Sequence, residues 1–193
     1  MNQVLRTVAV MIGMISATSA VAAPPPADPS MLPLFQKTCL DGQLTRAARE
    51  SAIASDGGWT VADASTLKFD QLGTVKSMGP ITDFRKPRDV KVWTRTVDGK
   101  PVRAVLASYG PKGSRYTGVC ALLVPGVKNG IAYFDGYRDL MRAIGLKGKS
   151  TDVPHYIEFS GKLAGGRPAH GELFSRSQVM PGERELMHLY VAF

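Results

Sequence analysis

Alternation between apolar and polar residues in the second half of the chain is the feature that most constrains the fold. Two alternating runs flank Asp98-Gly99, and an Asp-Gly pair in that position is a strong signal for a tight β-hairpin. Four further runs are separated by Gly-rich and Pro-Gly turns, which are typical of antiparallel connections. The six runs lie at 91–97, 100–109, 115–124, 154–163, 169–179 and 184–193. A weaker seventh strand is expected near 66–77.

The last run, 184–193, is apolar at both odd and even positions. A strand that alternates cleanly has one face in water, whereas a strand apolar on both faces is buried on both sides. We therefore expect this segment to be a central or well-covered strand.

Two segments have helical spacing instead. The first covers 32–59, where Asp41 is the expected N-cap and Gly57-Gly58 the expected end. Its buried face is predicted from the spacing i, i+3, i+4, i+7, which selects Leu44, Ala47, Ala48 and Ser51. Arg46 and Glu50 are expected to pair on its exposed side.

The second helix is predicted over 134–145, ending at Gly145. Its apolar stripe consists of Tyr137, Leu140, Met141 and Ile144. Strands in meanders with few helices indicate an α+β fold. We predict a single domain over 31–193, with an antiparallel sheet of about six strands and two helices packed on it.

The first 22 residues have the pattern of a secretory signal peptide. Arg6 precedes an uncharged run from Val8 to Val21, and Ala20-Val21-Ala22 fits the small-x-small cleavage motif. The run contains three hydroxyl residues and is followed by prolines, so a permanent membrane anchor is not expected. Residues 23–30 form a Pro-rich leader, because proline lacks the N–H that helices and sheets need. We expect a soluble periplasmic or secreted protein with no transmembrane segment after processing.

The chain has two cysteines, Cys39 and Cys120. In an oxidising compartment two cysteines most simply pair, and they lack the Cys-x-x-Cys spacing of a redox catalyst. A structural Cys39–Cys120 disulfide is therefore predicted, conditional on export.

Positive charge is in excess. Removing 22 of the 193 residues leaves 171, with 23 basic and 16 acidic side chains. Such a surplus favours anionic partners, and export excludes nucleic acid as the usual one. Two basic clusters are candidate anion-binding sites, and their members are Arg85, Lys86 and Arg88 (with Lys91) and Arg138, Arg142, Lys147 and Lys149.

Catalytic and cofactor motifs are weak. The segment 143–150 resembles a phosphate-binding loop, but it closes a helix where that loop should open one. Three histidines, His155, His170 and His188, lie in the C-terminal strands. His155 or His188 could meet Glu158 or Glu172 for acid–base chemistry if the strand register allowed it. No pair has tight metal-ligand spacing, so we expect neither a metal nor a cofactor.

Several landmarks together resemble small exported proteins of unknown function in Gram-negative, especially alphaproteobacterial, genomes. These landmarks are Phe35 and Cys39, Gly58-Trp59, Trp93, Gly118-Val119-Cys120 and Leu-Met-Arg-Ala-Ile-Gly-Leu at 140–146. The resemblance covers roughly residues 33–150 and implies a soluble envelope protein.

The sequence favours binding over catalysis. We expect an accessory factor or inhibitor in the cell envelope that binds an anionic component or another envelope protein. The alternative is an envelope hydrolase that uses histidine and glutamate residues of the C-terminal sheet.

Overall fold

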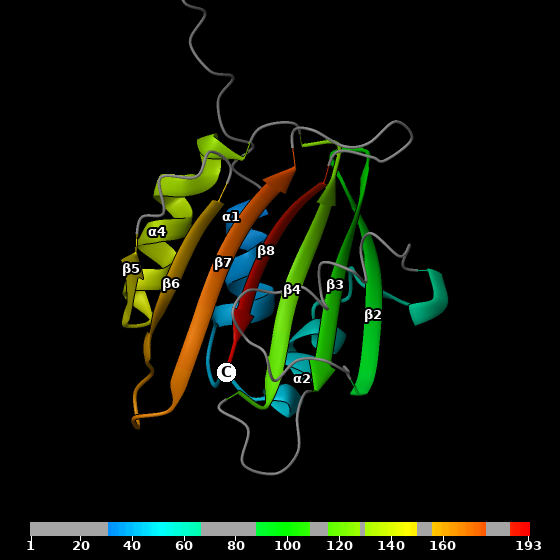
Figure 1. The fold of residues 1–193 in the computed structure, drawn as a ribbon. Coiled ribbons are helices and arrows are strands. Elements are labelled where there is room, and N and C mark those ends of the chain that lie inside the picture. The colour runs from blue at the N-terminus through cyan, green and yellow to red at the C-terminus, as the bar shows by residue number, and fades with distance from the viewer. Residues whose placement is uncertain (1–30, 67–87, 109–115, 128–129, 150–155, 177–185) are drawn as a thin grey trace, which may run out of the picture.

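The computed structural model describes residues 31–66, 88–108, 116–127, 130–149, 156–176 and 186–193. They form one antiparallel sheet with helices packed on it (Figure 1). The helices are α1 (Met31–Phe35), which continues into the π-helical segment η1 (Gln36–Leu40), α2 (Arg46–Ser55) and α4 (Phe134–Ala143). The strands are β1 (Thr60–Ala62), β2 (Arg88–Val97), β3 (Lys100–Ser108), β4 (Gly118–Pro125), β5 (Leu146–Lys149), β6 (Tyr156–Lys162), β7 (Pro168–Arg176) and β8 (Leu186–Ala192).

The strands lie in the order β1-β2-β3-β4-β8-β7-β6-β5. The predicted α+β class is confirmed, and all six predicted strands are present. The sheet has eight strands rather than about six because β1 and β5, of three and four residues, form its two edges. The weak strand expected near 66–77 lies outside the described residues except for Thr66, which ends a 3-10 helix.

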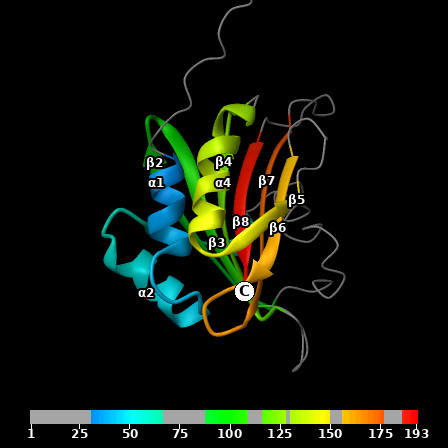
Figure 2. The same cartoon turned by 90° about the vertical axis from the view of Figure 1, so that its left-hand side faces the viewer.

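The two faces of the sheet are covered differently. Figures 1 and 2 show α1 and α2 on one side of the sheet. We call this side the helix face, and the side toward which Val105, Ala121 and Tyr190 point the opposite face. On the helix face, Phe35 and Tyr137 pack with Leu106 and Leu122 in the larger core cluster. The opposite face has its own smaller cluster, so both faces of the central strands are buried.

The Asp98-Gly99 hairpin is confirmed. Both residues have positive φ, 48° and 73°, as expected for a type I′ turn, which matches the twist of paired strands. The expectation for the last run is also confirmed, because β8 lies between β4 and β7 and its residues 187–192 are buried on both faces.

The N-terminal helical region differs from the prediction. It is interrupted after Leu40, and Gly42 adopts a φ of +74°, a conformation that is costly for other residues. Asp41 is therefore not an N-cap but the extended residue at which η1 ends. Thr45 caps α2, its side chain accepting a hydrogen bond from the Ala48 N–H at 3.3 Å.

The predicted buried face of the N-terminal helical region is correct only in part, since Leu44 is buried and Ala48 is half-buried. Ala47 and Ser51 are exposed, whereas Arg49 and Ile53 are buried. The expected Arg46–Glu50 pair does not form, because both side chains reach the sheet instead. Arg46 donates to Ser108 Oγ at 2.7 Å and to the Asp89 carbonyl, and Glu50 pairs with Lys91.

The second helix agrees with its prediction. Tyr137 and Met141 are fully buried in α4, and Leu140 and Ile144 pack against the core. Gly145 follows with a φ of +90°, so the chain turns there and enters β5.

The Cys39–Cys120 disulfide is confirmed, with a Cα–Cα distance of 5.5 Å. It links η1 to β4 in the middle of the helix face, where both cysteines are fully buried. The bridge therefore holds the N-terminal helical segment against the centre of the sheet.

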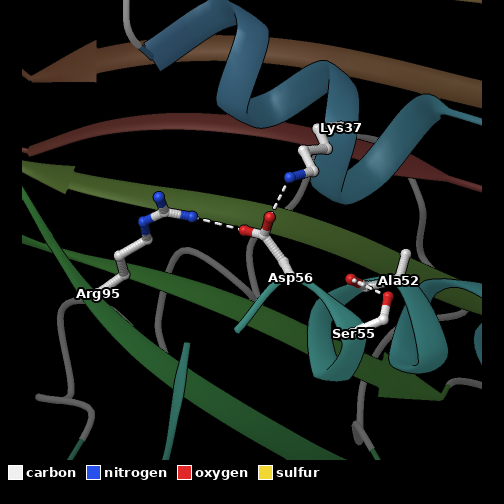
Figure 3. A network of polar contacts seen from close by, with 5 residues as sticks. All are labelled: Lys37, Ala52, Ser55, Asp56 and Arg95. Carbon is white, nitrogen blue, oxygen red and sulfur yellow. Dashed lines mark hydrogen bonds and ion pairs between the residues drawn. The ribbon is translucent and has the colours of Figure 1, made fainter. Parts of the chain in front are cut away.

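Asp56, just after α2, joins three elements. Its carboxylate pairs with Lys37 of η1 and with Arg95 of β2, the latter at 2.5 Å (Figure 3). The hydrogen bond from Lys37 lowers the pKa of Asp56; burial opposes this effect, and the charges of Lys37 and Arg95 reinforce it. Nearby, the Ser55 hydroxyl donates to the Ala52 carbonyl within the helix.

Among the helices of the described residues, none combines the length and hydropathy that crossing a bilayer requires.

Candidate functional site

Three neighbouring strands place polar side chains on the opposite face of the sheet. Glu158 of β6 lies opposite Glu172 of β7, and Glu172 lies opposite Tyr190 of β8. Directly opposed side chains on a sheet face are in contact range. The register therefore builds a row of two carboxylates and one phenol across the sheet.

His170, two residues before Glu172, lies between the two carboxylates. Its Nδ1 is 3.9 Å from Glu158 Oε1, and its Nε2 is 3.7 Å from Glu172 Oε2. Both distances exceed hydrogen-bond length. His170 is 3% exposed, and its Nε2 has no hydrogen-bond partner in the described part of the chain. A buried polar atom without a partner is uncommon and calls for an explanation.

Tyrosine hydroxyls donate hydrogen bonds to both carboxylates. Tyr190 donates to Glu172 Oε2 at 2.5 Å, and Tyr156 donates to Glu158 Oε2 at 3.0 Å. Burial, followed by the charge of Glu172, raises the pKa of both tyrosines above the ordinary value. Both phenols thus remain protonated donors at physiological pH.

We call the group Tyr156, Glu158, His170, Glu172 and Tyr190 the Glu–His cluster. Tyr190, His170 and Glu172 are buried, whereas the side chain of Glu158 is 22% exposed. Tyr116 and Tyr190 flank the imidazole, with ring centroids 6.4 and 6.0 Å away. The cluster therefore combines carboxylates, an imidazole and aromatic rings, with its accessible side at Glu158.

Two carboxylates in one partly buried site repel one another, and a cation between them relieves this repulsion. An imidazole beside a carboxylate is also the arrangement used in acid–base chemistry. The described residues contain no set of three or more His, Cys, Asp or Glu side chains arranged to hold a metal ion. The two carboxylates and the imidazole give the cluster the chemistry of a site for a proton or a cationic group.

The sequence named Glu158 and Glu172 as candidates but paired them with other histidines. His188 is buried one row away, where its ring packs against Phe174 at 5.9 Å. His155 lies outside the described residues. The structure instead brings His170 to the glutamates. Residues 156 and 158 share one face of β6, and residues 170 and 172 share one face of β7. The sequence alone does not show that these two faces coincide, because that depends on the strand register.

The basic candidates separate into different places. Arg85 and Lys86 lie outside the described residues. Arg88 begins β2, and Lys91 is paired with Glu50.

The second basic cluster is more coherent. Arg138 pairs with Asp135 on α4. Arg142 and Lys147, which lie on either side of the α4–β5 turn, are exposed, and so is Lys162. Lys147 lies opposite Ser160, two residues before Lys162 in β6, so the two lysines are diagonal neighbours on one face. We call Arg142, Lys147 and Lys162 the basic edge, and Lys149 follows on the same edge strand. Lys162 was not among the basic residues expected to bind anions, because only strand pairing brings it to this edge.

Comparison of the chain with protein-family models, curated proteins and solved structures found no match.

Proposed function

We propose that the chain is an exported protein that acts by binding, and that its basic edge docks on an anionic surface of the cell envelope. The observation that carries this proposal is the exposure of Lys147 and Lys162 on one face of the β5–β6 edge, with Arg142 exposed in the last turn of α4 just before β5. Each Lys or Arg near an anionic lipid surface contributes about 1 kcal/mol. The signal-like N-terminus and the buried disulfide support an oxidising compartment.

The test compares two variants of the chain 23–193 that lose the same charge. One carries Arg142→Gln, Lys147→Gln and Lys162→Gln, and the control carries Lys91→Gln, Lys100→Gln and Arg103→Gln in the β2–β3 hairpin. Binding to phosphatidylglycerol vesicles, with phosphatidylcholine vesicles as the neutral comparison, should weaken about 100-fold for the first variant and much less for the control. High salt should abolish the difference, because it screens exposed charges.

Lysines on an edge strand also prevent a sheet from pairing with another sheet. If preventing sheet pairing were the whole role of the basic edge, the basic-edge variant would bind vesicles as the control does. It would, however, self-associate in size-exclusion chromatography. Equal losses of binding in both variants would likewise contradict the proposal, since net charge alone would then explain the affinity.

The proximity of His170 to Glu158 and Glu172 supports a second candidate, an envelope hydrolase. In that role Glu158 would orient the imidazole, and His170 would take a proton from an attacking water. Release of soluble fragments from isolated envelope material, abolished by His170→Gln, is the expected result.

A further inference from the structure

The Glu–His cluster has more hydrogen-bond acceptors than the described protein donors satisfy. Tyr156 donates to Glu158 and Tyr190 donates to Glu172, and Tyr156 also interacts with Glu172. Two carboxylates offer about eight acceptor positions, more than these two hydroxyls fill. The Nε2 atom of His170 is buried within 3.7 Å of Glu172 Oε2 and has no hydrogen-bond partner in the part of the chain that the structure describes.

We propose that this cluster is a binding site for a primary ammonium group of a small ligand. An ammonium group has three donors and no acceptor. It therefore matches a site in which two carboxylates converge with a buried imidazole nitrogen that has no hydrogen-bond partner among the described residues. It also supplies the positive charge that two opposed glutamates require.

The surroundings of the cluster suit the same chemistry. Tyr116 and Tyr190 lie on either side of His170, and aromatic rings stabilise cations near their faces. The Glu158 side chain is 22% exposed, so a small amine can reach the cluster from that side.

The site is independent of the basic edge. Replacing Arg142, Lys147 and Lys162 by glutamine leaves every member of the Glu–His cluster in place. That variant should lose its docking on anionic vesicles and should still bind methylammonium, so one proposal can fail without the other.

The experiment is an NMR and calorimetric titration of the chain 23–193 with methylammonium and with putrescine. Tetramethylammonium, which has the charge but no N–H, is the comparison ligand. We expect the two primary amines to bind and to shift the His170 side-chain resonances, and tetramethylammonium to bind at least about tenfold more weakly, because hydrogen bonds to charged groups contribute about 1.5–3 kcal/mol.

Glu158→Gln and Glu172→Gln should each weaken methylammonium binding about tenfold or more. Glutamine retains an oxygen that accepts the tyrosine hydroxyl, so both variants should fold, which urea unfolding checks. Glu50→Gln, at an exposed glutamate of α2, is the matched control and should leave binding unchanged.

Three results would overturn the proposal. The first is the absence of any saturable amine binding by the folded protein. The second is unchanged affinity in both cluster variants. The third is a nitrogen spectrum that shows His170 protonated at both ring nitrogens with no amine present, since an imidazolium would itself neutralise the glutamates.

Discussion

Arg49 is buried, although arginine side chains are mostly exposed in folded proteins. It is 2% exposed, and its guanidinium donates to the carbonyls of Thr38 and Asp41 at the end of η1. The last carbonyls of a helix lack partners within the helix, and Arg49 supplies donors from α2. The helical wheel could not predict this, because it orders residues by polarity and contains no information on the carbonyls of another segment.

Replacing Arg49 by methionine keeps an unbranched side chain but removes every donor. We expect the free energy of unfolding to fall by about 2 kcal/mol, since buried carbonyls left without donors cost about 1–3 kcal/mol. Urea unfolding measures the loss. Arg142→Met, at an exposed position, should change stability by less than about 0.5 kcal/mol; a similar loss in both variants would refute the capping role.

Asp56 gives the fold a defined dependence on pH. Its folded-state pKa is lowered, first by the Lys37 hydrogen bond, so its stabilising effect is present above the unfolded-state pKa of about 4 and is lost as the pH falls through the folded-state value. Asp56→Asn should cost about 1 kcal/mol at neutral pH. The gap between variant and parent in urea unfolding should narrow as the pH falls below about 4. A gap that stayed constant would mean that the carboxylate charge is not involved.

Elements with strong local signals were predictable. The Asp98-Gly99 turn, the apolar stripe of α4 and the doubly apolar β8 all carry their signal within a short window of sequence. The break between η1 and α2 was missed because the helical spacing continues across Asp41 and Gly42. The edge strands β1 and β5 were missed because three or four residues are too few to establish a period of two.

Close packing between α4 and β7 depends on Gly171. A Cβ there would lie 2.3 Å from Met141 Sδ and 2.9 Å from Tyr137 Oη, both well inside contact distance. Gly171→Ala should destabilise the protein by about 1–3 kcal/mol, as overpacked cores do. Thermal unfolding of Gly171→Ala, Met141→Ala and the double variant tests the contact, and the double variant should lose less than the sum of the two. Simple additivity would show that α4 does not lie this close.

The whole molecule depends on one covalent link between distant segments. The disulfide closes a loop of 81 residues, which the chain-entropy model values at about 4–4.5 kcal/mol as an upper guide. The variant Cys39→Ala/Cys120→Ala should therefore unfold roughly 10 °C lower in a thermal scan. Reductant should lower the midpoint of the parent but not that of the variant. A parent that is insensitive to reductant under denaturing conditions would contradict the bridge.

Only part of the candidate site could be predicted from the sequence, because the rest depends on how whole strands pair with one another. Glu158 and Glu172 stand out as acidic residues within apolar strands, whereas the choice of His170 over His188 depends on which residues face one another across β6, β7 and β8. Register is a property of the complete sheet and has no local signature when both faces of a strand are buried.

The position of β8 determines when the molecule can assemble. The strands β1 to β4 and β5 to β7 meet only through it among the described strands, and it is the last of them along the chain. In a polypeptide that emerges N-terminus first, these two groups of strands can join only after residues 186–192 have been made. Neither half of the sheet can therefore be completed on its own during synthesis, and closure awaits the last of the described strands.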